Sequence, residues 1–408
     1  MHNATKRDIK IGMQPQLLSV VTYTHLIIGD TAMVEDRTVD KFGTEDDVSE
    51  ASLTRRRKIE HIEICLDEEV QCQRSTMFED IEFVHNALPE INKDKIDLTT
   101  NFFGLRASAP LVIAAMTGGH PKTKNINQRL ASAAEELGLP IGVGSQRAAV
   151  EDPSLADTFT IVRESAPSVP VIANIGATHV DVAPEAVEMI DADILAIHLN
   201  PLQEAIQPEG DCNSIGALES IASIVESVDV PVIVKETGAG ISSDVAKRLE
   251  EVGVVGVDVG GVGGTSWAGV EYFRAQKEDD DLKAQLGLEF WDWGIPTALS
   301  VLMVLDSTEL DVIATGGIRS GLDIAKALAL GATAAGVAHP LLRQAVHGSS
   351  LDVVVELERF LEGLTVAMYL TGSEKVEDLS SKQLILSGKL VESLKSLGID
   401  YQKVARGI

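Results

Sequence analysis

Cysteine, aromatic residues and basic charge are all scarce in this chain of 408 residues. Its three cysteines, Cys65, Cys72 and Cys212, are odd in number and fit neither a CxxC pair nor a Cys/His metal site. We therefore expect free thiols in a reducing compartment. Hydrophobic residues make up 45% of the chain and aromatic residues only 4%, so a sizeable core is possible with few aromatic rings.

The charge balance is strongly acidic, with 34 basic against 62 acidic residues and a formal net charge of −28. Such a balance argues against non-specific binding to nucleic acid or to an anionic membrane surface. No apolar run reaches the roughly 18 residues of a membrane span. The first ten residues are polar and lack the apolar core of a signal peptide. We expect a cytoplasmic protein with neither nucleic-acid nor membrane partners.

From Leu111 onward, short apolar runs alternate with amphipathic stretches of helical period. The predicted strands are Leu111–Met116, Ile141–Gly144, Val171–Ile175, Ile194–Ile197, Val230–Val234, Val254–Val259, Val312–Ala314 and Ala334–Val337. The predicted helices are Lys124–Leu137, Ala183–Ile190, Ala217–Val228, Asp244–Val252, Thr297–Leu305 and Leu322–Leu330. Near-continuous apolar strands separated by helices are typical of a parallel sheet covered on its faces.

Eight such units over about 250 residues predict an α/β fold, a (β/α)8 TIM barrel. A doubly wound open sheet is the alternative, but the first strand–helix junction lacks the expected G-x-G-x-x-G fingerprint. We place the barrel at residues 111–370, an N-terminal arm at 51–110 and a C-terminal helical segment at 371–408. Residues 1–50 show little period, and we expect them to be disordered or a mis-called start.

Polar and glycine-rich segments follow seven of the eight predicted strands, whereas the strand starts carry none. These segments are Thr117–Gly119, Ser145–Arg147, Asn174, His198–Glu204, Lys235–Glu236, Gly260–Ser266 and Gly316–Arg319. The carboxyl ends of barrel strands meet at one face, where barrel enzymes carry their active sites. The pattern predicts an active site at that face.

The densest of these segments runs from His198 to Asp211 and holds an imidazole, amides and carboxylates. Carboxylates beside an amide suit Mg²⁺, which takes oxygen ligands and shares its shell with substrate phosphates. A capped loop with solvated acidic groups is the alternative. Glu271 follows the glycine-rich Gly260–Ser266 segment closely enough to face the site, although a surface helix would also explain it.

Three further features indicate phosphate or flavin chemistry. Gly316–Arg319 precedes a predicted helix, and glycines with a helix N-terminus suit a phosphate, although a tight turn would look the same. Lys235 ends a strand and is able to meet an anionic flavin or form a Schiff base, with a salt bridge to Glu236 as the alternative. Arg55–Lys58 reverses the local charge as a polyanionic ligand would require, unless it is a solvated linker.

Together these motifs resemble type 2 isopentenyl-diphosphate isomerase, the FMN-dependent flavoprotein of isoprenoid biosynthesis. The matching pieces are Arg57-Lys58 with His61, Ala115–His120, Gly144–Arg147, His198–Pro201 with Gln203-Glu204, Gly263–Trp267 and Gly316–Arg319. They stand in family order over residues from about 54 to 370. The Gly-Gly-Ile-Arg piece is common among FMN barrels, whereas His198–Glu204 combined with Ser145–Arg147 is specific. The segment before Arg55 departs from the family, which begins almost at its basic motif.

The resemblance implies binding sites for FMN, for the substrate and for Mg²⁺. FMN would lie near Ala115, Met116, Thr117, Ser145, Asn174, Lys235, Thr265, Gly317, Ile318, Arg319, Ala335 and Gly336. The substrate would contact Arg57, Lys58, His61, Ser145, Gln146, Arg147, His198, Asn200 and Gln203. Glu204 would bind Mg²⁺, and the residues implied in catalysis are Gln203, Glu271 and His198.

The implied isomerase interconverts isopentenyl and dimethylallyl diphosphate by a 1,3-allylic proton shift, with reduced FMN as acid and base and Mg²⁺ holding the diphosphate. NADPH or another reductant would activate the flavin, and the protein would be a homo-oligomer, a tetramer or octamer. An FMN-dependent barrel oxidoreductase of the 2-hydroxy-acid or dihydroorotate type is the main alternative. A flavin-free phosphosugar barrel and a non-catalytic barrel protein are the others.

Overall fold

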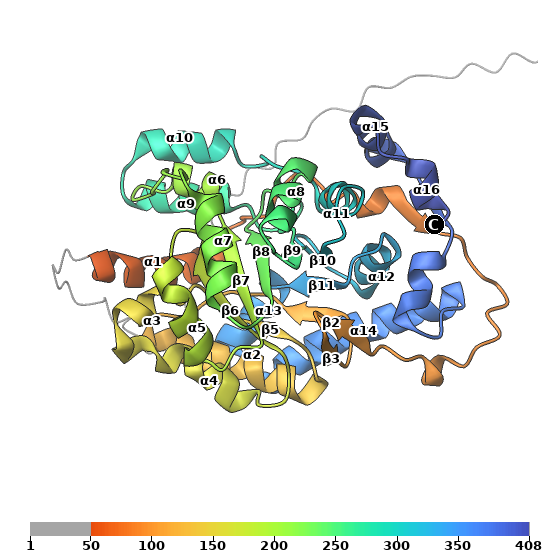
Figure 1. Cartoon of the computed structure of the whole chain (residues 1–408), viewed down its shortest axis with the longest axis horizontal. Helices are drawn as coiled ribbons and strands as arrows, with labels where there is room; N and C mark the ends of the chain where they lie inside the picture. The colour runs from red at the N-terminus through yellow and green to blue at the C-terminus, as the bar shows by residue number, and fades with distance from the viewer. Residues whose placement is uncertain (1–49, 408) are drawn as a thin grey trace, which may run out of the picture. The chain divides into compact units, whose positions relative to one another are not determined.

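A closed barrel of eight parallel strands forms the centre of the protein in the computed structural model, which describes residues 50–407 (Figure 1). The strands are β4 (Leu111–Ile113), β5 (Ile141–Gly142), β6 (Val171–Gly176), β7 (Ile194–Leu199), β8 (Val232–Glu236), β9 (Gly256–Asp258), β10 (Asp311–Thr315) and β11 (Ala334–Val337). Each pairs in parallel with its neighbour, and β11 closes the barrel against β4. The predicted barrel and its eight strands are confirmed. The N-terminal extension, residues 1–49, lies outside the described residues.

The strands are apolar along their length because both of their faces are buried. Side chains alternate across a strand, and in β6 Ile172 points into the barrel while Val171 and Ala173 pack against the outer helices. In β7 Ile194 and Ala196 likewise point inward. This two-sided burial explains why the strands read as continuous apolar runs rather than as an alternating pattern.

The helices around the barrel include all six that the sequence predicts. They are α2 (Lys124–Leu137), α5 (Ala183–Met189), α7 (Ala217–Ser227), α8 (Ser243–Glu251), α11 (Thr297–Leu305) and α12 (Gly321–Ala329). Helix α2 ends at Gly138, which takes the left-handed conformation (φ 66°) that favours glycine at a helix end. Two more helices, α13 (His339–His347) and α14 (Ser350–Thr371), follow β11. None of the helices within residues 50–407 is both long and apolar enough to cross a membrane.

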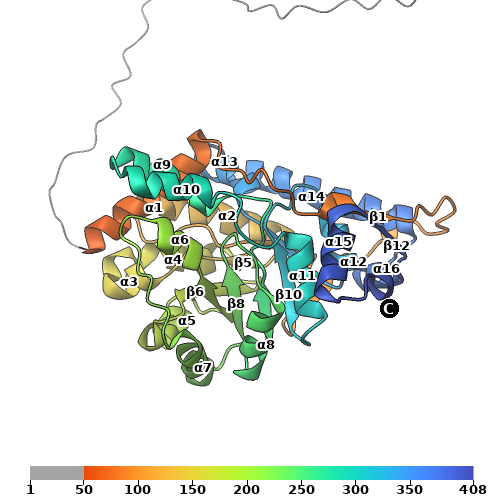
Figure 2. The same cartoon turned by 90° about the horizontal axis from the view of Figure 1, so that it is seen from above.

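The N-terminal arm packs against both ends of the barrel. Helix α1 (Glu50–Asp67) packs against α13 and against α9 (Trp267–Lys277), which lies in the long connection after β9 (Figure 2). The antiparallel strands β2 (Thr100–Phe102) and β3 (Leu105–Ala107) instead cover the amino ends of the barrel strands. Phe102 is fully buried there against the inward side chains of the barrel.

The C-terminal segment, predicted to be helical, also contains a strand. Residues after α14 form β12 (Leu384–Leu386), α15 (Gly388–Leu397) and α16 (Tyr401–Ala405). Strand β12 pairs antiparallel with β1 (Ile81–Phe83), so the N-terminal arm and the C-terminal segment are joined beside the barrel (Figure 2). This pairing depends on residues about 300 positions apart, which no local pattern reveals.

Candidate active site

Polar side chains from neighbouring strands meet at the carboxyl mouth of the barrel. His198 on β7 is in register with Lys235 on β8, and Lys235 is in register with Asp258 on β9. Lys235 Nζ donates a hydrogen bond to the main-chain oxygen of Glu236 (3.0 Å). The Glu236 carboxylate instead accepts from the backbone N–H groups of the loop from Gly238 to Gly240. The alternative of a side-chain salt bridge between Lys235 and Glu236 is therefore not found, because both side chains bond to the main chain instead.

His198 is held in one tautomer by Asn174. Its Nδ1 lies 2.9 Å from Asn174 Oδ1, and Asn174 Nδ2 donates to the Val143 carbonyl (3.0 Å). Because the amide oxygen faces the ring, Nδ1 carries the proton and Nε2 is an acceptor. Burial and the charges of Lys235 and Lys58 lower the pKa of His198 to about 3, so the ring is neutral at pH 7. An anion would bind at Nε2 only with uptake of a proton.

A buried carboxylate joins the arm to the mouth. Glu271 on α9 is fully buried, and its Oε1 lies 2.9 Å from both His61 Nε2 on α1 and Gln203 Nε2. Its Oε2 accepts from Arg274 Nη1 (2.7 Å). Burial alone would raise the pKa of Glu271, but the bonds from these three partners outweigh it and lower the pKa to about 2. The alternative of a surface position for Glu271 is wrong.

Glu204 on α6 (Pro201–Ile206) has no ion-pair partner among the described residues. Its Oε1 accepts from Asn200 Nδ2 (2.9 Å), and its Oε2 accepts from Gln207 Nε2 (2.5 Å) and the Asp211 amide (3.0 Å). These donors are neutral, so the carboxylate suits a hard cation. Within residues 50–407 no group of three or more His, Cys, Asp or Glu side chains could hold a metal. A metal at Glu204 would therefore need other oxygen ligands, as a diphosphate would supply.

The basic motif lies on α1 beside this segment. Arg57 Nη1 lies 3.6 Å from Glu209 Oε1. Lys58 is half-buried, and no hydrogen bond or ion pair of its ammonium is found with the described part of the chain. Burial and the charge of Arg57 lower the pKa of Lys58 to about 8. Burial of an unpaired charge is costly, so an anion that paired with this ammonium would be bound favourably.

The mouth also fits a flavin. The buried Thr117 hydroxyl, after β4, has no hydrogen-bond partner among the described residues, and Lys235 on β8 places a cation on the opposite side of the same mouth, four strands away. Thr117 and Lys235 are thus able to meet the polar edge of a flavin ring, which carries both donors and acceptors. The residues present fit the cofactor that the motifs imply.

The phosphate end of such a cofactor would lie between the last two strands. Gly316 and Gly317 have φ of 110° and 74°, which favour glycine and expose the backbone of the loop. Helix α12 is already capped by Ser320, whereas α13 begins after Ala338, whose methyl side chain cannot cap it. A hollow of about 310 Å³ nearby is lined by residues that include Gln71, Arg319, His339 and Arg343, and also by the carboxylates of Glu68 and Glu69. The α13 N-terminus is thus the better phosphate site of the two.

The side chains of some predicted site residues make contacts within the protein rather than pointing into the mouth. Gln146 is fully buried, donates to the Ala186 carbonyl (2.8 Å) and accepts from the Asn174 amide (3.0 Å). Arg147 pairs with Glu151 on its own short helix, α3 (Arg147–Glu151), at 2.6 Å. The Ile318 side chain packs in the core, which leaves only its backbone for a ligand. Their predicted contacts stay predictions.

The remaining predicted residues lie at the strand ends, where the mouth forms. Thr265 is bridged to Gln71 of the arm, and Ala335 and Gly336 lie within β11. Ala115, Met116 and Ser145 follow β4 and β5 and are partly exposed. Sequence reasoning missed Arg274 and Gln71. The only available signal for Arg274 was a charged pair, Glu271 and Arg274, three residues apart on an otherwise largely apolar helix.

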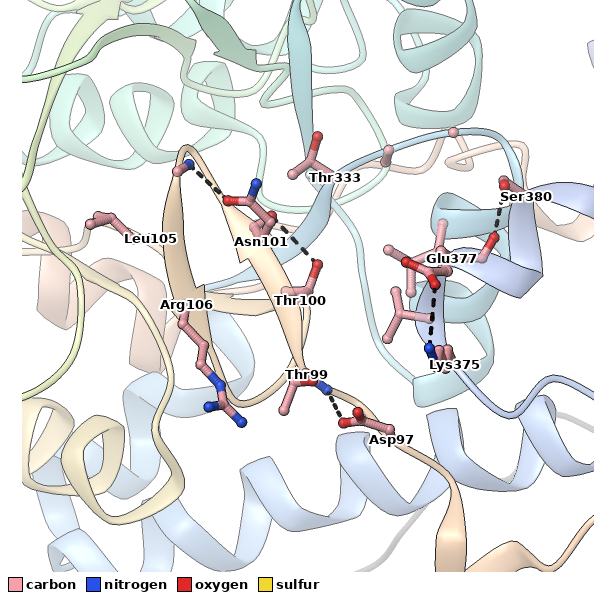
Figure 3. A pocket seen from close by; sticks show the side chains of 15 residues that line it. Asp97, Thr99, Thr100, Asn101, Leu105, Arg106, Thr333, Lys375, Glu377 and Ser380 are labelled. Atoms are coloured by element: carbon pink, nitrogen blue, oxygen red, sulfur yellow. Dashed lines mark hydrogen bonds and ion pairs between the residues drawn. The ribbon is translucent and has the colours of Figure 1, made fainter.

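A larger cleft, of about 640 Å³, lies at the other end of the barrel (Figure 3). It is lined by the β2–β3 hairpin, the turn before β11 and residues 375–380. Arg106, Asp97 and Lys375 are among its polar side chains (Figure 3). None of the predicted site residues lines it. Size alone therefore does not locate the chemistry in this protein.

The FMN-dependent dehydrogenase family matches the chain over residues 51–157 and 209–386. An isopentenyl-diphosphate delta-isomerase of Methanothermobacter thermautotrophicus is 55% identical over 86% of the chain and 98% of its own length. One of Archaeoglobus fulgidus is 53% identical over 83% and 98%. Among solved structures, a mandelate oxidase mutant is 19% identical with a TM-score of 0.55, covering 83% of this chain and 100% of its own. A lactate oxidase of Pediococcus acidilactici is 17% identical with a TM-score of 0.57, over 83% and 94%. These oxidases share the fold.

Proposed function

Because the chain belongs to the isopentenyl-diphosphate delta-isomerases and carries the barrel of the FMN-dependent dehydrogenase family, we propose that it interconverts isopentenyl and dimethylallyl diphosphate by a 1,3-allylic proton shift. One observation carries the proposal most strongly. His61 of the arm and Gln203 of the mouth share the same oxygen of Glu271, each at 2.9 Å. That contact brings the basic motif and the polar segment after β7 into one site.

The diphosphate would be bound by the cations of α1. The hydrocarbon tail of the substrate has no polar group for the protein to bind, so the affinity for the substrate must come from its phosphates. Lys58 has no acceptor among the described residues, and Arg57 has only a loose contact with Glu209. Mg²⁺ would be held by Glu204 together with diphosphate oxygens, which supply the ligands that the protein lacks.

Gln203 and Glu271 would orient the reacting carbons. Reduced FMN, activated by NADPH or another reductant, supplies an acid and base at the ring when bound. Glu271 is ionised over the whole physiological range and therefore accepts hydrogen bonds rather than donating a proton. Its constant charge fixes the Gln203 amide, whose Oε1 lies 3.3 Å from Asn200 Nδ2. The role of these residues is to orient the substrate.

An FMN-dependent oxidoreductase of the 2-hydroxy-acid or dihydroorotate type is the second candidate. The likeness of the fold to mandelate and lactate oxidases favours it. That chemistry would consume an oxidant or reductant in each turnover, whereas the isomerisation is redox-neutral. The two candidates therefore differ in stoichiometry rather than in cofactor.

The test is turnover of isopentenyl diphosphate by the FMN-loaded protein before and after reduction with dithionite or NADPH. We expect dimethylallyl diphosphate only after reduction, with far less than one NADPH consumed per product. Consumption of one NADPH per product would support the oxidoreductase instead. We also propose that the protein is cytoplasmic and forms a homo-oligomer, a tetramer or octamer. Light scattering of the same sample would test the oligomeric state.

A further inference from the structure

Arg274 lies at the junction of three segments of the chain. Its side chain is only 3% exposed. It donates to Glu271 Oε2 on its own helix α9 (2.7 Å), to Glu60 Oε2 on α1 (3.0 Å) and to both oxygens of Glu209 in the loop after α6 (2.9 and 3.3 Å). These contacts use all three nitrogens of the guanidinium, a planar fork that a lysine cannot reproduce.

Each of the three carboxylates holds a further group on its other side. Glu271 contacts His61 and Gln203, and Glu209 lies 3.6 Å from Arg57. Glu60 accepts from Arg56 (2.6 Å) on the same helix. Arg274 is therefore one contact away from Arg57, a cation assigned to the diphosphate, and one contact away from the amide assigned to the reacting carbons.

The buried charge of Glu271 explains why water cannot take the place of the Arg274 guanidinium. Glu271 is fully buried, and Arg274 is the cation whose side chain reaches its second oxygen. A buried carboxylate that loses its cation either takes up a proton or moves toward water. In both cases the Gln203 and His61 hydrogen bonds change, because the two share one oxygen of that carboxylate.

We propose that Arg274 is a positioning residue that sets the distance between the diphosphate site on α1 and Gln203 at the mouth. It is not among the residues assigned to substrate or cofactor, and it acts through Glu271 on one side and through Glu60 and Glu209 on the other. The inference rests on the proposed function, since it names the residue that aligns the two halves of that site. Its consequence is that one substitution weakens both diphosphate binding and turnover.

The test compares full-length FMN-loaded wild type with Arg274→Gln, Arg274→Lys, Glu271→Gln and the double variant Arg274→Gln/Glu271→Gln. We expect Arg274→Gln to lower kcat about 100-fold, the scale of a 1 Å misplacement, and to weaken inorganic diphosphate binding about tenfold. Arg274→Lys should recover affinity but not kcat. The double variant should lie within about threefold of Glu271→Gln in kcat, because both changes remove the same coupling.

Arg163→Gln is the matched control. Arg163 on α4 (Asp157–Ser165) is also largely buried and binds Asp193 (2.6 Å) and main-chain carbonyls away from the mouth. It should lower the melting temperature and leave both kcat and diphosphate affinity unchanged. If Arg274→Gln does not fold, Arg274→Lys and the double variant, which removes the charges as a pair, carry the comparison.

The outcomes separate this inference from the proposed function. If wild type does not isomerise isopentenyl diphosphate, the proposed function fails, and calorimetry with inorganic diphosphate still decides whether Arg274 positions the cations of α1. If wild type is active, unchanged kcat and diphosphate affinity in Arg274→Gln overturn the inference. Multiplicative losses in the double variant overturn it as well, because they would show that Arg274 and Glu271 act independently.

Discussion

The two ends of the barrel bury opposite kinds of side chain. The carboxyl mouth buries Glu271, Gln203 and Arg274, which satisfy one another through hydrogen bonds. The amino end buries hydrocarbon, with Phe102 against inward-facing residues such as Ile172, and its charged groups lie along an open cleft (Figure 3). Buried ion pairs contribute little net stability, whereas buried aromatic rings contribute much. We therefore expect one end to carry function and the other stability, a division typical of this fold.

The largest expected effect comes from removing the cations at the mouth. Changing Arg57 and Lys58 together to methionine removes two charge-assisted contacts, each worth about 1.5–3 kcal/mol. We expect kcat/KM for isopentenyl diphosphate to fall about 1000-fold, mainly through KM. Steady-state kinetics checks this, with the melting temperature as a control. A variant with unchanged KM would remove α1 from the substrate site.

A comparable change at the amino end should act on stability alone. Phe102→Ala leaves a cavity in a fully buried position and should cost about 3–5 kcal/mol in the free energy of unfolding. The kcat of the folded fraction should change less than about twofold. Arg106→Ala on the same hairpin is exposed and should cost less than about 0.5 kcal/mol. Denaturant titration with parallel assays checks both, and a large loss of kcat in Phe102→Ala would show that the two ends are coupled.

The mouth should also respond to alkaline pH. The pKa of Lys58 is lowered to about 8, so its ammonium is charged below that pH and neutral above it. Since kcat/KM reports the free enzyme, it should fall about tenfold per pH unit above 8. The arginine of Lys58→Arg keeps its charge to above pH 12, so this variant should not show the fall of kcat/KM above pH 8. The same alkaline fall of kcat/KM in wild type and Lys58→Arg would assign the titration to another group.

The smallest effect should come from the metal site. Glu204→Gln keeps the shape and removes the charge, so half-activation should need at least about tenfold more Mg²⁺. Gln203→Leu should lower kcat with little change in the Mg²⁺ dependence, because its amide carries no charge to give a metal. Titration of initial rates with Mg²⁺ compares the two, with bound FMN checked by absorbance. Identical curves for Glu204→Gln and wild type would pass the metal role to Glu209 or Asp211.

The prediction from sequence was accurate where the signal is local. The eight strands and six helices follow from the alternation of apolar runs and amphipathic stretches, and α2 and α11 match to the residue. It was also accurate for which end of the strands carries polar groups. Parallel strands all end at the same face, so placement along a strand predicts placement in space.

The prediction from sequence was less accurate where tertiary packing decides which partner a side chain contacts. Gln146 stands in a polar segment after a strand, yet its amide joins Asn174 and Ala186 inside the fold. For Glu271 a surface helix was nearly as consistent with the sequence, because its own helix does not show what covers it. Its burial depends on α1, whose His61 lies 210 positions away in the sequence.

The sequence by itself determined the barrel, the face on which its polar residues gather and the types of residue available there, because burial on both sides of a strand imposes a pattern at short range. Only the tertiary structure decided which charges meet. Arg274 contacts Glu60 across 214 positions and Glu209 across 65, and no spacing rule connects such residues. Electrostatic energy depends on distance in space and on exclusion of water, and both are set only once α1, α6 and α9 have packed together.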